Sequence, residues 1–165
     1  MKNAMLSILV KNRVGVLSRI AALFSRRGYN IESLSVCATE DSAVSRMTIT
    51  VENDRRSVEQ IKKQLQKQED VLFVKELNAE NSVSRELLLV KLKVESEQRR
   101  ESLINICSIF KAKTVDITID TMTVELTGRN DKIDALLGVL QNYQIIEMAR
   151  SGVSALQRGD ATIKE

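Results

Sequence analysis

The same succession of apolar patterns occurs twice along the 165 residues of this chain, and this repetition constrains the fold most strongly. Continuous or alternating apolar runs predict strands, and apolar stripes that recur every three to four residues predict helices. In the first half we predict strands at residues 5–10, 31–38, 44–52 and 71–77, and helices at residues 16–27 and 58–65. The predicted order of elements is therefore βαββαβ.

The second half repeats this order after a polar stretch. Predicted strands lie at residues 86–94, 115–119, 122–126 and 145–150, and predicted helices lie at residues 103–110 and 133–140. Two such units predict an α+β protein made of two ferredoxin-like βαββαβ sandwiches. We place the first domain at residues 1–78, a linker at 79–85 and the second domain at 86–165.

Several residues predict how these elements end. Gly28 follows the first helical stripe and is expected to provide a left-handed C-terminal cap. Ser57 with Gln60 resembles a capping box, and Asn130 or Asp131 is expected to cap the last helix. The polar segment from Arg150 to Gly152 is expected to be a solvated end of the last strand.

One face of each sheet is expected to stay uncovered within a single chain. Met5 and Leu9 in the first half, and Leu87 and Leu89 in the second, would place apolar side chains on these faces. Exposed apolar patches usually pair with another surface, so we expect self-association through an edge strand or through the sheet face. A homodimer is the simplest form of such association.

Composition narrows the class of protein. Apolar residues make up 43% of the chain and charged residues 28%, which is typical of a soluble globular protein. No apolar run approaches the length of a membrane span, and the N-terminal residues do not resemble a secretion signal. A cytoplasmic location is expected, with Cys37 and Cys107 as buried free thiols in a reducing environment.

Nucleic-acid binding and catalysis are both disfavoured. The net charge is only +3, aromatic residues make up 3% of the chain, and there is no Trp on which a base could stack. The chain has no His, no nucleophile in an elbow motif and no carboxylates at metal-binding spacing. We therefore expect no catalytic residue, no bound metal and no cofactor in this chain, and no partnership with nucleic acid or membrane.

The segment from Asn12 to Ile31 is the candidate binding site. Gly15 opens the first helix, whose first backbone N–H groups lack intrahelical partners and can hold a carboxylate. Asn12 and Asn30 flank this strand–turn–helix–turn unit and are expected to face the same spot, where they suit the ammonium group of an amino acid. Val14, Val16, Leu17 and Ile31 would supply an apolar wall for an aliphatic side chain.

The second half lacks this turn. Its first predicted helix is preceded by Val94-Glu95-Ser96-Glu97, which is acidic and polar. We therefore expect an interaction module or a relay there, and no equivalent ligand site.

These residues resemble a known family. Asn12-Arg13-Val14-Gly15-Val16-Leu17-Ser18-Arg19-Ile20, the run from Phe24 to Leu34, Ser45-Arg46-Met47-Thr48-Ile49 and Arg150-Ser151-Gly152 are similar to the regulatory small subunits of acetolactate synthase (acetohydroxyacid synthase). The Asn-x-x-Gly pattern marks the broader class of ACT domains. Many members carry Pro before that Gly, where this chain has Val14.

The resemblance implies an N-terminal ACT domain, a C-terminal ACT-like domain and a homodimer with valine between two ACT domains. It implies that Asn12, Gly15, Val16, Leu17, Asn30 and Ile31 line the effector pocket. It further implies a large catalytic partner that uses thiamine diphosphate, Mg and FAD, is activated by this chain and is inhibited by valine, the product of branched-chain amino-acid biosynthesis. Two alternatives stay open: an ACT-domain sensor that regulates a different enzyme, and an RNA-binding protein built on a ferredoxin-like sheet.

Overall fold

The computed structural model describes residues 3–52 and 55–164 and divides the chain into two compact units. The first unit contains the residues up to Ser84 together with those from Val153 onward. The second unit is the continuous stretch from Arg85 to Gly152. Each unit has its own core.

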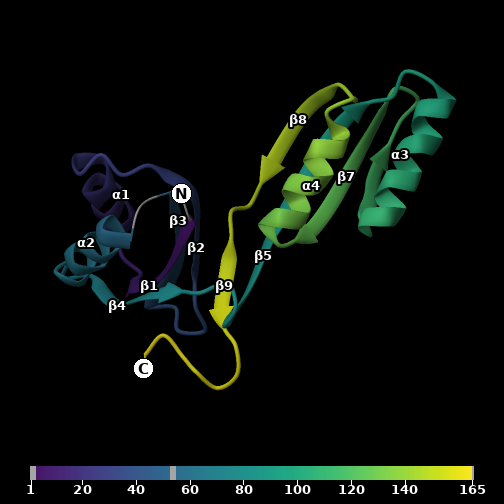
Figure 1. Ribbon diagram of the computed structural model, residues 1–165. Coiled ribbons are helices and arrows are strands. Elements are labelled where there is room, and N and C mark those ends of the chain that lie inside the picture. Colours follow the sequence, from purple (N-terminus) through teal and green to yellow (C-terminus); the bar gives the residue numbers. More distant parts are fainter. Residues whose placement is uncertain (1–2, 53–54, 165) are drawn as a thin grey trace. The chain divides into compact units, whose positions relative to one another are not determined.

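The first unit is a four-stranded antiparallel sheet with two helices on one face (Figure 1). Its elements are β1 (Asn3–Lys11), α1 (Val16–Arg26), β2 (Ile31–Ala38), β3 (Val44–Glu52), α2 (Arg55–Gln66) and β4 (Val71–Leu77). The strand order is β2-β3-β1-β4, so β2 is an edge strand. Alternate residues of the central strands, such as Leu6 and Ile8, are fully buried against Ile20 and Ile61 of the helices.

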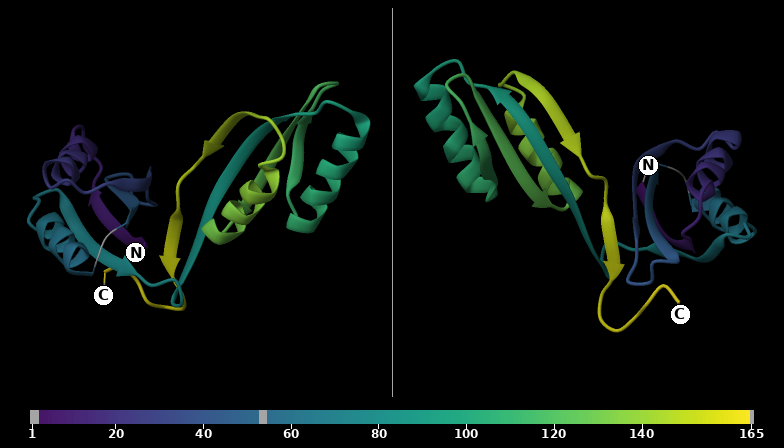
Figure 2. Two further views of the ribbon diagram at one scale, coloured as in Figure 1. Left: turned by 45° about the horizontal axis from the view of Figure 1, so that its top comes forward. Right: turned by 180° about the vertical axis from the view of Figure 1, so that it is seen from behind.

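The second unit repeats the arrangement, again with its two helices on one face of the sheet (Figure 2). Its elements are β5 (Ser82–Lys93), α3 (Glu97–Phe110), β6 (Lys113–Ile117), β7 (Thr121–Gly128), α4 (Asn130–Leu140) and β8 (Ile145–Arg150), in the order β6-β7-β5-β8. The prediction of an α+β protein with two βαββαβ units is therefore confirmed. A short additional strand, β9 (Ser154–Gln157), pairs with β5.

Of the predicted helix caps, only the C-terminal cap of α1 matches the structure. Gly28 has a φ of 69°, and the amides of Gly28 and Tyr29 donate to the carbonyls of Ser25 and Phe24, which is a Schellman cap. The predicted cap at Ser57 is wrong because α2 already begins at Arg55. The predicted cap of α4 is also wrong, since the N-cap position falls on Arg129 and has no side-chain cap.

The C-terminal segment from Val153 to Lys164 packs on the first sheet, on the face opposite α1 and α2. Val153 and Ala155 cluster with Leu77 and the half-buried Met5, and the Lys75 ammonium donates to the Thr162 carbonyl oxygen at 3.0 Å. Leu9, which was expected to be exposed on this face, is only 3% exposed. The expectation of an uncovered sheet face is therefore wrong for the first unit.

The position of the C-terminal segment differs from the predicted domain boundaries. Residues 153–164 belong to the first compact unit, although the polar tail was expected to stay with the second domain at 86–165. The expected linker 79–85 contains the beginning of β5, which starts at Ser82. Both differences arise because β9 pairs with β5. Strand pairing between distant segments leaves no local signal in the sequence.

Two serines of β2 hold the C-terminal segment through its backbone. The Ser35 hydroxyl donates to the Val153 carbonyl oxygen at 2.6 Å, and the Val153 amide donates to Ser33 Oγ at 3.2 Å. Ser33 and Ser35 are two residues apart and so point to the same face of the sheet.

We expect the double variant Ser33→Ala, Ser35→Ala to loosen this segment, because two partly buried hydrogen bonds worth about 1 kcal/mol each are lost. Hydrogen exchange should then become faster at residues 153–164 and stay unchanged in α3 and α4. Unchanged exchange at Val153 would show that the serines do not hold the segment.

Candidate functional site

The turn between β1 and α1 has a geometry that requires glycine. The Val16 amide donates to the Arg13 carbonyl oxygen at 3.3 Å, which closes a four-residue turn with Gly15 at its third position. Gly15 has φ 83° and ψ −6°, the values of the third residue of a type II turn. Val14 occupies the second position, where Pro is common in such turns.

The amino end of α1 carries no side-chain cap. Gly15 is the N-cap residue and has no side chain that could accept from the amides of the first turn, and no acidic residue lies in that turn. The amides of Leu17 and Ser18 belong to the turn for which an α-helix offers no carbonyl partner. The partial positive charge at this helix end therefore remains available to a carboxylate.

Arg19 places its guanidinium group beside Gly15. A Cβ atom at Gly15 would lie 3.1 Å from Arg19 Nη1, so the guanidinium lies directly against the turn. Arg19 is held there by an ion pair with Asp70, whose side chain is 18% exposed. Sequence reasoning missed both residues: Arg19 follows Gly15 at helical spacing, but Asp70 is 51 positions away from Arg19.

Asn12 is committed to the hairpin between β2 and β3. Its side-chain amide donates to the Ser42 carbonyl oxygen at 2.9 Å, and its backbone amide donates to the Ala43 carbonyl oxygen at 2.7 Å. The hydrogen bond to Ser42 fixes the side-chain amide of Asn12 and therefore also the direction of its carbonyl oxygen. Asn12 thus also joins the β1–α1 turn to the end of β2.

Asn30 and Ile31 lie at the other end of the sheet in the same protomer. Ile31 pairs with Val51 of β3, and Val51 pairs with Ala4 near the beginning of β1. Asn12 follows the end of β1, eight residues and roughly 25 Å of strand away from Ala4. The expectation that Asn12 and Asn30 face the same spot is therefore wrong within one chain.

The four residues of the predicted apolar wall do not lie together in one protomer either. Val16 is 3% exposed and packs into the core of the first unit, so only its backbone can face a ligand. Leu17 is 42% exposed and Val14 is fully exposed at the tip of the turn. Leu17 and Val14 can therefore contact an aliphatic side chain. Ile31 lies at the other end of the sheet and would have to be supplied by a second protomer.

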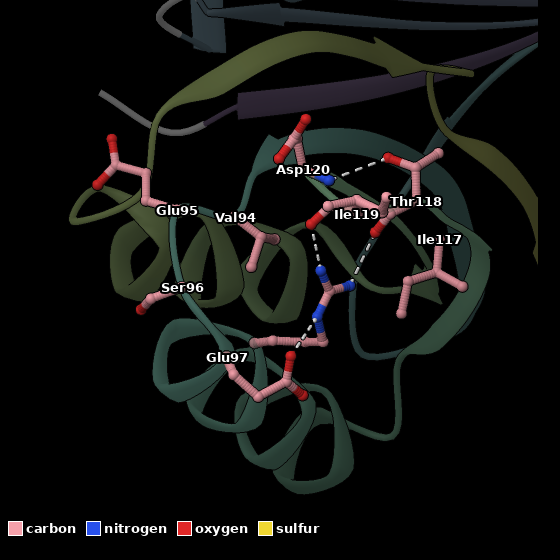
Figure 3. Close-up of a pocket in the computed structure, with 9 residues that line it drawn as sticks. Val94, Glu95, Ser96, Glu97, Ile117, Thr118, Ile119 and Asp120 are labelled. Atoms are coloured by element: carbon pink, nitrogen blue, oxygen red, sulfur yellow. Dashed lines mark hydrogen bonds and ion pairs between the residues drawn. The ribbon is translucent and has the colours of Figure 1, made fainter.

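The corresponding turn of the second unit is capped by its own side chain. Ser96 Oγ accepts from the Arg99 amide at 3.2 Å, and Glu97 lies in the first turn of α3. A hollow of about 750 Å³ adjoins this turn, and Figure 3 shows Glu95, Glu97 and Asp120 around it. These acidic side chains disfavour the binding of a ligand carboxylate in the hollow.

Arg100 also lines this hollow. Its guanidinium donates to the carbonyl oxygens of Thr118 and Ile119 in the β6–β7 hairpin and pairs with Glu97 (Figure 3). The two units thus differ at the same topological position. The first has an uncapped, positive helix end, and the second has a capped end lined by carboxylates.

No group of three or more His, Cys, Asp or Glu within residues 3–52 and 55–164 is arranged to hold a metal ion. Within the same residues, no helix is long and apolar enough to cross a membrane.

The two cysteines differ, and the prediction that both are buried is wrong for one of them. Cys37 is exposed on the edge strand β2, whereas Cys107 is on the buried face of α3, and neither forms a disulfide. Burial raises the pKa of the Cys107 thiol.

A thiol reagent should therefore label the native protein at Cys37 alone, because a thiol must be reached and ionised to react. Mass spectrometry of the labelled protein should find Cys107 modified only after unfolding. A Cys37→Ser variant should stay unlabelled when native; native labelling of that variant would contradict the burial of Cys107.

Comparison with known proteins places these features in a family. Residues 6–73 match the family described as AHAS small subunit-like ACT domain, and residues 85–159 match the family described as small subunit of acetolactate synthase. The acetolactate synthase isozyme 3 small subunit of Salmonella typhimurium is 47% identical over 160 residues, which cover 96% of this chain and 98% of that protein. The probable acetolactate synthase small subunit of Methanothermobacter thermautotrophicus is 45% identical over 158 residues, which cover 96% and 94%.

The solved structures agree. The crystal structure of the acetolactate synthase small subunit from Thermotoga maritima superposes with a TM-score of 0.88 at 33% identity, and the match covers 98% of this chain and all of that one. The fold and the match over the first unit define a protein of the ACT-domain class. Within that class, the chain belongs to the acetolactate synthase small subunits, the non-catalytic regulatory partners of that enzyme. The resemblance noted in the sequence is therefore confirmed.

Proposed function

We propose that this chain activates the large catalytic subunit of acetolactate synthase and makes it sensitive to feedback inhibition by valine. The uncapped amino end of α1 at Gly15, in a chain of this family, is the observation that carries the proposal. Backbone amides, the helix dipole and Arg19 suit the carboxylate of an amino acid. Leu17 and Val14 suit a branched aliphatic side chain.

A homodimer would complete the site. β2 is an edge strand, and an isologous pair of β2 strands related by a two-fold axis runs antiparallel. The beginning of one β2, with Asn30 and Ile31, would then lie beside the end of the other. That end adjoins the β2–β3 hairpin to which Asn12 is hydrogen-bonded. Residues that lie far apart in one protomer would thus meet across the dyad, twice per dimer.

Feedback inhibition then requires only that valine bind one arrangement of the pair more tightly than another. Valine bound between two first units would favour one arrangement of the pair, and its preference for that arrangement is the whole source of inhibition. A coupling of roughly 1–3 kcal/mol is enough. Thiamine diphosphate, Mg and FAD would belong to the large subunit, and the complex would act in the cytoplasm in branched-chain amino-acid biosynthesis.

Co-purification with the large subunit, followed by assays of acetolactate formation, tests this proposal. We expect the large subunit to be more active with this chain than alone, and valine to reverse part of the gain. Failure of the two chains to associate would refute the assignment of partner. Activation without a response to valine, leucine or isoleucine would refute the effector site.

A further inference from the structure

We infer that the helical face of the first unit carries a basic docking site for an acidic segment of the large catalytic subunit. The site is a hollow of about 520 Å³ beside the end of α1 and along α2. Its lining includes the cations Arg27, Lys63 and Lys67, with Gln60 and Gln64 between them. This inference rests on the proposed partnership with the large subunit and adds the surface through which it forms.

The three cations line one hollow, and none of the residues that line it is acidic. Gln60 precedes Lys63 by three residues and Gln64 by four, and Lys67 follows them by four and three residues, which places all four on one side of α2 and the turn after it. Arg27 lies at the C-cap of α1 and completes the lining. Because Lys63 and Lys67 are four residues apart, their like charges repel on this helical face.

The three cations of the hollow differ from those surface cations whose charge is offset by a carboxylate of the chain. Arg19, Lys62, Lys91, Arg100, Arg129 and Arg150 each pair with a carboxylate of the chain. Within the described residues, no ion pair includes Arg27, Lys63 or Lys67, and all three are exposed. Lys62, next to Lys63 in sequence, turns instead to Glu59 and Glu76.

The other surfaces of the first unit point to the occupant. The C-terminal segment covers part of the open face of the sheet, and the β2 edge is the surface proposed for the second copy. The helical face is left for a partner of another kind. An acidic segment would supply carboxylates to the three cations and hydrogen-bonding groups to the glutamine amides, and such complementarity raises both the rate and the specificity of association.

The test neutralises the cluster and compares it with an equal loss of charge elsewhere. The docking variant is Arg27→Gln, Lys63→Gln, Lys67→Gln, and the matched control is Lys93→Gln, Lys113→Gln, Lys164→Gln, which are also exposed. The dissociation constant for the purified large subunit is measured over a series of salt concentrations. We expect the docking variant to bind at least about 10-fold more weakly at low salt, with a flatter salt dependence, and the control to stay within about twofold.

Each other outcome overturns the inference. Equal weakening of both variants would indicate a non-specific charge effect, and unchanged binding of both would leave the cluster without a role in docking. Inorganic triphosphate serves as a probe for a small anion: if it binds the wild type and not the docking variant, while both bind the large subunit alike, the hollow is an anion site. Failure of the wild type to bind the large subunit would refute the proposed function itself.

Discussion

The Gly15→Asp variant should lose feedback inhibition by valine while still activating the large subunit. The substitution places a carboxylate at the uncapped amino end of α1, where the carboxylate of the effector is proposed to bind. The new side chain would accept from the free amides and would approach Arg19, whose Nη1 lies 3.1 Å from the added Cβ position. Occupation and like-charge repulsion together should weaken valine binding by roughly 100-fold or more.

Gly15→Asn is the matched control for this variant. Both substitutions impose a side chain on a residue with φ 83°, so both carry the same backbone strain, and Asn and Asp tolerate this region better than other residues. Asn lacks the negative charge and should keep a measurable response to valine. Unchanged inhibition in Gly15→Asp, or equal loss in both variants, would contradict a carboxylate site at this helix end.

Replacing Arg150 by Ala should strongly destabilise the second unit. Arg150 binds Glu86 through two hydrogen bonds, of 2.9 Å from Nε and 2.7 Å from Nη2, and pairs with Asp134 at 3.1 Å. Glu86 is only 3% exposed, so truncation of Arg150 would leave a buried carboxylate without its cation. We expect the free energy of unfolding to fall by about 3 kcal/mol, measured by denaturant titration.

The pKa of Arg150 determines how this contribution depends on pH. The hydrogen bonds that Arg150 donates to Glu86 raise the pKa of Arg150 above its usual value, so titration of Arg150 removes none of this stabilisation below that usual value. The difference between wild type and Arg150→Ala should therefore stay constant between about pH 6 and pH 9. Asp134→Asn is the control: Asp134 is 62% exposed, and its loss should cost no more than about 1 kcal/mol. A larger loss in the control than in Arg150→Ala would contradict the role given to Glu86.

The sequence predicts the elements well where their periodicity reports burial. The bounds predicted for the second, third and fourth strands of the first unit are those of β2, β3 and β4, because alternating apolar residues mark the face that packs on helices. The positions of Arg150 and of residues 153–164 were not predictable in this way. Their partners, Glu86 and the serines of β2, are 64 and more than 100 positions distant.

The residues of the candidate site also differ in whether the sequence could predict their positions. Gly15 could be predicted because a strand, a turn and a helix meet there within a few residues, and a positive φ favours Gly. The separation of Asn12 from Asn30 could not be predicted from their spacing, since it follows from the register of β1, β2 and β3. Sequence proximity to one helix suggested a common site, but the two ends of a helix face opposite ends of the sheet.

Calorimetric titration of the purified chain with valine, leucine, isoleucine and serine is the most direct test of this account. It predicts heat of binding for at least one branched-chain amino acid in the wild type, none for that ligand in Gly15→Asp, and a dimer in sedimentation under the same conditions. A monomer that binds no branched-chain amino acid, or a Gly15→Asp variant that binds as tightly as the wild type, would contradict the claim that the amino end of α1 holds the effector.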